Sequence, residues 1–495
     1  MNYLSFRFNF LFRSTRGLVL VAVAMISLVT AFFGMLSGPM EQLGVKDFMI
    51  RTFGLDLAPA EREGRIIMLY HTIAMAVVAI ETYLITALVV MKKETITWIN
   101  STITIGYMAS MIFGLLFAYF GHNYVYHGIF LFGQSLIFFA GLMLATALWP
   151  WKKAARTTDP ERAHTKGGTD LERVAFFTMT VATLGSVLFG AIPGSLFGNG
   201  FESFLAEDVV REVHKTTLQL AVIGHLHIML ALIAVALNLI LCRWFDFKGK
   251  LQKIAMPLTI AGTLIITAGV WMVVPFEAIA HIIINVGSFP VLISSLLLVY
   301  FGWRKITDKR LAEINCARPT FTQRLRALLH DPLKFGVLWQ MVYMNFVVTL
   351  VGVFMAIRLD AIIRKWAATD ERIGLTGHWH VLAGIIGTII LLCFADISGL
   401  KGRLRQLFGW VIIIGSDLAF GAVAIYEIKR LFVSELAQDP MVNILLLLID
   451  IGLASVLIAL GIFMVWRLID LFHKNGRWKK ESDNPGLLDS QEVTQ

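Results

Sequence analysis

Charged residues are scarce in this sequence of 495 residues. Asp, Glu, Lys and Arg make up 16% of the chain, whereas apolar residue types make up 57%. The mean hydropathy of +0.72 confirms this imbalance. A water-soluble globule of this length needs more polar side chains than that to cover its core. The composition therefore excludes a water-soluble protein and predicts an integral membrane protein.

Cysteine is also scarce, and its spacing excludes two further classes. The only cysteines are Cys242, Cys316 and Cys393, and no two of them form a CxxC pair. We expect all three at or near the cytoplasmic side, where disulfides are rare, so neither a disulfide framework nor a zinc site is indicated. The absence of a CxxCH motif excludes covalently attached heme, and no glycine-rich phosphate loop stands at a strand-to-helix turn.

Long apolar runs recur along the whole chain. A helix of about 20 apolar residues crosses the ~30 Å hydrocarbon layer of a bilayer. Such runs predict an all-α membrane protein with a single membrane domain and twelve transmembrane helices, and no soluble domain intervenes. The predicted spans are 17–36, 67–91, 102–120, 127–149, 175–194, 219–242, 254–274, 278–302, 337–357, 379–398, 408–427 and 442–468.

The net charge of +9 is spread over the connections on one side of these spans. Basic residues gather in 152–173, in 304–334 and in 401–405, and not in one patch, so nucleic acid is not an expected partner. The positive-inside rule makes this side cytoplasmic and places both termini there. We expect a multi-pass protein of a bacterial-type cytoplasmic (inner) membrane, with 17–36 retained as an anchor and the polar tail 476–495 disordered.

Three segments of the sequence resemble one another. They are RIIMLYHTIAMAVVAI from residue 65, QLAVIGHLHIMLALIA from residue 219 and RIGLTGHWHVLAGIIG from residue 372. His225 follows His71 by 154 residues and precedes His378 by 153 residues. This period predicts three four-helix arcs, roughly 1–150, 151–303 and 304–475, around a pseudo-threefold axis.

Five histidines share one depth in the predicted membrane: His71, His225, His227, His378 and His380. A single histidine in a membrane helix is ordinarily a core residue bonded to a neighbouring backbone. Five histidines that recur at a fixed period favour a functional role over a purely structural one, because polar groups inside a bilayer are costly. Neutral imidazole is the usual protein ligand of heme iron, so we expect heme.

Helical geometry suggests how these imidazoles pair. Residues i and i+2 are about 200° apart around a helix, so each HxH motif points to two different neighbours. A cyclic repeat then pairs His71 with His380 and His227 with His378, giving two hemes. His225 is left as a spare, because Ile73 stands where its partner would be.

These motifs resemble the catalytic subunit of the heme-copper oxidase superfamily, which includes cytochrome oxidases and nitric oxide reductases. The resemblance covers the twelve-helix, three-arc architecture, the histidine of helix two and the G-H-x-H of helix ten. It implies that His71 and His380 bind a six-coordinate heme and that His378 binds a second heme. It also implies that His225 or His227 contributes to a second metal.

The resemblance also assigns a role to the basic pair Lys429 and Arg430 after helix eleven. In that family such a pair binds heme propionates. The ordinary reading is a solvated pair of charges at the membrane interface.

The sequence departs from the family at helix seven. The family has two adjacent histidines there, whereas GVWMVVPFEA at 269–278 has none, and 219–242 and 254–274 contain no tyrosine. Copper is therefore not expected. Either Glu277 and His281 join the imidazoles around a nonheme iron, or the second metal is absent and His227 binds heme directly.

Three carboxylates lie within apolar runs: Glu81, Asp417 and Asp450. They are candidates for proton transfer, and the ordinary reading is that each is protonated or hydrogen-bonded between helices. The expected function is an oxidoreductase subunit of a respiratory chain that moves electrons through two b-type hemes. Its electrons would come from quinol or from a c-type cytochrome, and additional membrane subunits are expected.

Two other functions stay open from the sequence. The first is a terminal reductase of oxygen or nitric oxide with an atypical second metal. The second is a twelve-helix secondary transporter, for which repeats and buried carboxylates are equally natural.

Overall fold

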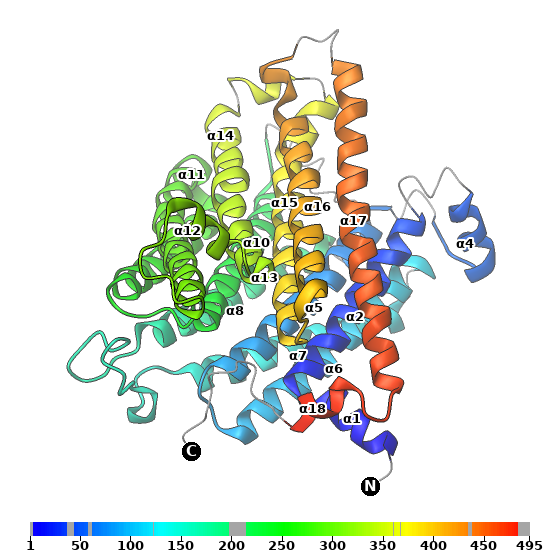
Figure 1. Ribbon diagram of the computed structural model, residues 1–495. Helices are drawn as coiled ribbons and strands as arrows, with labels where there is room; N and C mark the ends of the chain where they lie inside the picture. Colours follow the sequence, from blue (N-terminus) through cyan, green and yellow to red (C-terminus); the bar gives the residue numbers. More distant parts are fainter. Residues whose placement is uncertain are drawn as a thin grey trace.

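The chain is helical throughout the part that the computed structural model describes (Figure 1). This part comprises residues 3–36, 44–57, 62–121, 123–197, 214–359, 361–366, 368–433 and 438–483. Within it the only β-type pairing is an isolated bridge between Ala163 and Asp170. The all-α prediction is confirmed for these residues.

Eleven of the described helices are long and apolar enough to cross a membrane. The chain is therefore a membrane-embedded helical protein by the length and composition of its helices. These helices are α2 (Thr15–Leu36), α5 (Arg62–Leu88), α6 (Lys93–Tyr119), α7 (Tyr124–Leu148), α8 (Leu171–Phe197), α10 (Thr217–Trp244), α11 (Lys250–Glu313), α13 with α14 (Pro332–Tyr343 and Thr349–Arg358), α15 (Ala368–Ile397), α16 (Gly402–Ile428) and α17 (Gln438–Phe472). A π-helical turn, Met344–Val348, joins α13 to α14.

Helix α11 accounts for the difference between eleven helices and twelve predicted spans. Its 64 residues include both 254–274 and 278–302, and the backbone leaves helical geometry at Phe276 (φ −146°, ψ 62°), directly after Pro275. The two halves then pack antiparallel. Thr259 Oγ1 lies 2.6 Å from Ser294 Oγ, and a Cβ on Gly262 would lie 2.9 Å from the carbonyl oxygen of Gly287. The helix is thus a hairpin, and each half exceeds the ~20 residues of one span.

Three helices meet where the repeated segments lie. Helix α10 contacts both α5 and α15, and a hydrogen bond of 2.8 Å between Tyr70 and His380 links α5 to α15. Helices α10 and α15 lie side by side near the centre of Figure 1. In the apolar stretch of α15, 67% of the residues are buried, whereas in that of α17 only 11% are buried. Helix α15 is therefore central and α17 is peripheral.

Other helix contacts connect these three helices to the rest of the bundle. Helix α7 contacts α8, α11 contacts α13, and α17 contacts α2. Each of these contacts joins the last part of one predicted arc to the first helix of the next.

The start of the polar tail is ordered, which corrects the prediction of a disordered end. Residues Arg477–Asp483 form the short helix α18, and the Trp478 side chain is buried against Phe6 and Phe10 of α1 (Tyr3–Arg13). Arg467 of α17 donates hydrogen bonds of 3.0 and 2.7 Å to Glu481. The buried Trp478 and the ion pair of Arg467 with Glu481 hold α18 in place. The polar composition of the tail predicts neither contact. Residues 484–495 lie outside the described part.

Candidate functional site

Helix α10 points its two histidines at different neighbours, as their i, i+2 spacing predicts. His225 Nδ1 lies 2.9 Å from the carbonyl oxygen of Ser186 on α8. His227 Nδ1 lies 2.8 Å from the carbonyl oxygen of Ile223, one turn earlier on α10. A carbonyl can only accept, so Nδ1 carries the proton in both rings. This tautomer leaves each Nε2 with a lone pair that can bind a metal.

Helix α15 holds the second pair of histidines on either side of Trp379. The Trp379 ring packs edge-on against His227 with ring centroids 4.5 Å apart, and against His378 at 5.7 Å. His227 and His378 are also close enough to interact electrostatically. His380 points to α5, where its Nε2 lies 2.8 Å from the hydroxyl oxygen of Tyr70.

His378 lies in a narrow cleft between α14, α15 and α16. The cleft is also lined by Val351, Val381 and Glu427. A Cβ on Gly352 of α14 would come within 3.2 Å of the His378 ring. A glycine at position 352 therefore gives the imidazole its space.

His71 lies on α5, beside Tyr70. Its ring is perpendicular to Phe130 of α7 with centroids 6.4 Å apart, and it interacts electrostatically with His225. The five predicted ligands therefore lie on the three central helices but face different ways. His225 faces α8, His378 faces α14 and α16, and His380 is exposed beside Tyr70.

The expected helix contacts each hold one imidazole of a predicted pair beside an aromatic side chain. At the contact of α5 with α15, His380 bonds to Tyr70, the neighbour of His71. At the contact of α10 with α15, His227 packs against Trp379, whereas His378 faces α14 and α16. An aromatic side chain thus accompanies each pair, which the sequence did not predict.

Heme is a cofactor that these side chains fit. A heme iron would need only two axial ligands from the protein. His227 offers a free Nε2, whereas the Nε2 of His380 bonds to the Tyr70 hydroxyl and would exchange that bond for iron. Two buried polar atoms beside the histidines, Trp379 Nε1 and Glu427 Oε1, have no hydrogen-bond partner within the described residues. Such buried atoms are rare in native proteins unless a water or a ligand satisfies them.

A nonheme metal site receives less support. In the described ranges, no group of three or more His, Cys, Asp and Glu side chains gathers closely enough to hold a metal ion. Glu277 and His281 are exposed at the tip of the α11 hairpin.

The basic pair after α16 binds a carboxylate of the chain itself. Lys429 Nζ and Arg430 Nε each lie 2.5 Å from Asp370, at the start of α15. Burial raises the pKa of Asp370, but the hydrogen bonds from Lys429 and Arg430 outweigh this and hold its pKa below the ordinary value. Lys429 is only 3% exposed, so its ammonium group is not a solvated charge.

The three predicted proton-transfer carboxylates lie in unlike surroundings. Glu81 is buried in α5, and its Oε1 has no hydrogen-bond partner in the described part of the chain. Asp417 accepts hydrogen bonds from Trp339 Nε1 (2.7 Å) and Gln340 Nε2 (2.9 Å) of α13. Asp450 is exposed on α17. The structure does not bring these three side chains together.

Sequence reasoning missed three side chains at this site. Trp379 lies between the two histidines of the GHWH motif, and Tyr70 directly precedes His71, so adjacency to a histidine was an available signal. Glu427 lies two residues before Lys429, and a Cβ on Gly377 would collide with its carboxylate. The lack of a side chain at residue 377 therefore lets the carboxylate reach α15.

No protein-family model and no curated protein matches this sequence. A functional proposal therefore depends on the residues and their geometry.

Proposed function

We propose that this chain is a heme-containing subunit of a membrane oxidoreductase that moves electrons through two b-type hemes. One observation carries the proposal: five imidazoles lie on the three mutually linked helices α5, α10 and α15, at one end of each apolar stretch. A transporter has no comparable need for imidazoles at a fixed period of 154 and 153 residues.

Each imidazole has a stated role in this proposal. His71 and His380 would hold one heme, and His227 and His378 would hold the other. When bound, the two hemes supply one-electron carriers between a donor and an acceptor. His225, bonded to α8 through Ser186, would stay a spare.

The residues around the histidines exclude water and hold charge. Trp379 closes the contact of α10 with α15 and is 8% exposed. Lys429 and Arg430 place two positive charges at the end of α16, of which Asp370 neutralises one; the remaining positive charge would suit a heme propionate.

The proposed membrane arrangement has twelve spans in three arcs. The hairpin form of α11 supports two crossings by this helix. The α7–α8, α11–α13 and α17–α2 contacts support a ring of three units. The basic connections support a bacterial-type inner membrane with both termini in the cytoplasm.

Additional membrane subunits form part of the proposal, and the outward face of α17 supports this. Asp450 is exposed on α17. It lies ten residues, or ~15 Å of helix, beyond Pro440, where the apolar stretch begins. A carboxylate at that depth is costly against lipid. A Cβ on Gly461 would meet nothing within 4 Å, so this face has room for a neighbouring helix. The electron donor would be quinol or a c-type cytochrome.

A second candidate is a terminal reductase of oxygen or nitric oxide with nonheme iron at His227, Glu277 and His281. The spacing of Glu277 and His281 supports it, because residues four apart in the second half of α11 share one helical face. Carbon monoxide separates the two candidates, since it binds a heme with an open axial position. Two six-coordinate hemes in the resting protein bind none.

The proposal is tested by the heme-to-chain ratio in a pyridine hemochrome assay. We expect two b-type hemes in the wild-type chain, and the loss or conversion of one heme in His71→Ala and in His378→Ala. His330→Ala, at an exposed loop position, serves as the control and should keep both hemes. A heme-free wild-type chain, or unchanged spectra in both variants, overturns the proposal, and a heme-free chain favours the transporter.

A further inference from the structure

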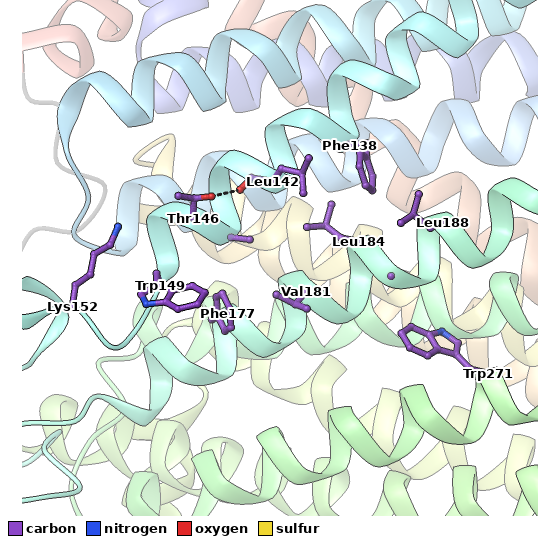
Figure 2. A pocket seen from close by; sticks show the side chains of 12 residues that line it. Phe138, Leu142, Thr146, Trp149, Lys152, Phe177, Val181, Leu184, Leu188 and Trp271 are labelled. Atoms are coloured by element: carbon purple, nitrogen blue, oxygen red, sulfur yellow. Dashed lines mark hydrogen bonds between the residues drawn. The ribbon is translucent and has the colours of Figure 1, made fainter.

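An apolar groove of about 640 Å³ runs along the outside of the bundle between α7 and α8 (Figure 2). Leu142 and Thr146 of α7 form one wall, and Phe177 and Val181 of α8 form the other. Trp271 of α11 closes one end. Except for Thr146 and one lysine, every lining side chain is apolar or aromatic.

The length of the groove matches one leaflet of a bilayer. Its α8 wall extends from Phe177 to Leu188, which corresponds to ~16 Å of helix. Half of a ~30 Å hydrocarbon layer is about the same length. One end lies beside Trp149 and Lys152, just after the end of α7, and tryptophan and lysine are typical of the membrane interface.

The end of the groove that Trp271 closes is shaped to hold this indole. A Cβ on Gly185 would come within 2.8 Å of the Trp271 ring, and Trp271 Nε1 donates a hydrogen bond of 3.3 Å to Ser186 Oγ. A larger residue at 185 would push the indole out. The groove is therefore a formed feature of the α8–α11 contact.

Lys152 lies at the interfacial end without an acidic partner. It is exposed and makes no ion pair with any residue that the structure describes. The acidic side chains at the start of α8 are already paired: Asp170 lies 2.9 Å from Arg243, and Glu172 lies 3.1 Å from the same arginine. The mouth of the groove thus presents a positive charge that an anion can neutralise.

The same lining is unsuited to quinol. Oxidation of a quinol releases two protons, and a site for it needs a base such as a carboxylate or an imidazole. The lining includes neither. The Thr146 hydroxyl is already bonded to the carbonyl oxygen of Leu142 at 2.8 Å, as the dashed line in Figure 2 shows.

We infer that this groove is a binding site for one anionic phospholipid. An acyl chain lies between α7 and α8, and the phosphate group pairs with Lys152 on the basic side of the membrane. Anionic lipids attract basic residues at a membrane surface, and the buried chain adds to the affinity with each methylene group. This inference is independent of the proposed heme function.

The test uses the full-length protein in nanodiscs of equal parts phosphatidylglycerol and phosphatidylcholine. After exchange into detergent, native mass spectrometry counts the lipids that each chain retains. We expect the wild type to retain phosphatidylglycerol in at least about fivefold preference. Lys152→Glu should abolish the preference, and Val181→Trp, which fills the groove, should reduce retention of both lipids.

Two matched controls accompany these variants. Lys153→Glu makes the same charge change one residue later, outside the groove lining, and Leu453→Trp enlarges an exposed apolar residue on α17. Both should retain lipid like the wild type. The inference is overturned if the wild type retains the two lipids equally or retains a quinone in place of phospholipid. It is also overturned if Lys152→Glu keeps the preference and Val181→Trp keeps full retention.

Discussion

Two carbonyl oxygens determine which nitrogen of each α10 imidazole keeps a free lone pair. Ser186 and Ile223 accept from the Nδ1 atoms of His225 and His227, so Nε2 is the free atom in both rings. Such outer contacts fix the tautomer and the ring orientation of metal-binding histidines. What differs between the two rings is the helix that each faces: α8 for His225 and α15 for His227.

The side chain of Asp370 links the start of α15 to the end of α16 through its ion pairs with Lys429 and Arg430. In Asp370→Asn, the buried Lys429 ammonium loses its charged partner. We expect a loss of about 1–3 kcal/mol in the free energy of unfolding, measured by thermal or denaturant unfolding in detergent at pH 7. Asp308→Asn is the control. Its carboxylate pairs with Arg304 at an exposed position, and it should cost less than about 0.5 kcal/mol.

The contribution of Asp370 also has a predictable dependence on pH. Its folded-state pKa is held below the ordinary value by Lys429 and Arg430, so its stabilising effect is present above the unfolded-state pKa of about 3.9. The difference between wild type and Asp370→Asn should be undiminished at pH 5 and should be lost as the pH falls below 4. A difference that already disappears between pH 7 and pH 5 contradicts this assignment.

Only two features of the candidate site could be predicted from the sequence: the positions of the histidines, from the repeat period, and their opposite directions, from the i, i+2 spacing. The 154-residue interval located the histidines, and the i, i+2 rule placed His225 and His227 against different neighbours. The positions of Tyr70 and Glu427 depend on contacts between helices far apart in the chain. A residue pattern within one helix does not predict such contacts. The pairing of Asp370 with Lys429 was missed for the same reason.

At the scale of elements, α11 shows how a proline and one non-helical residue turn a 64-residue helix into a hairpin. Pro275 removes a backbone donor, Phe276 leaves helical geometry, and glycines on both halves allow close packing. Sequence patterning predicted two spans here, 254–274 and 278–302. It could not predict that Thr259 and Ser294 face each other.

A substitution at Gly262 tests the packing of this hairpin. A Cβ there would lie 2.6 Å from Val291 Cγ2, so Gly262→Leu should overpack the contact and lower the free energy of unfolding by about 1–3 kcal/mol. Gly461→Leu makes the same change where nothing lies within 4 Å. Equal unfolding midpoints for the two variants would show that the two halves of α11 do not pack this way.

The two crossings proposed for α11 have a topological consequence. In a chain whose Cys242, Cys316 and Cys393 are replaced by Ser, Glu277→Cys should react with a membrane-impermeant maleimide added to intact cells. Lys250→Cys should react only after the membrane is permeabilised. Labelling of both positions from the same side would show that α11 does not cross the membrane twice.

At the scale of the whole molecule, the repeat in the sequence corresponds to an arrangement in space. The similar segments from residues 65, 219 and 372 fall on α5, α10 and α15, the three helices that meet in the bundle. The helical class and the positions of the long apolar helices followed from hydropathy, because a bilayer requires backbone hydrogen bonds to be satisfied within each helix. The docking of α18 on α1 did not follow, since it depends on one aromatic contact in a polar segment.

Helix α10 carries two imidazoles to which the heme proposal assigns different roles: His227 would bind iron and His225 would not. His225→Ala and His227→Ala remove the same side chain from positions two residues apart on one helix. The measurement is the number of hemes per purified chain by pyridine hemochrome. We expect two hemes in the wild type and in His225→Ala, and one in His227→Ala. Two hemes in both variants, or none in the wild type, would contradict the heme proposal.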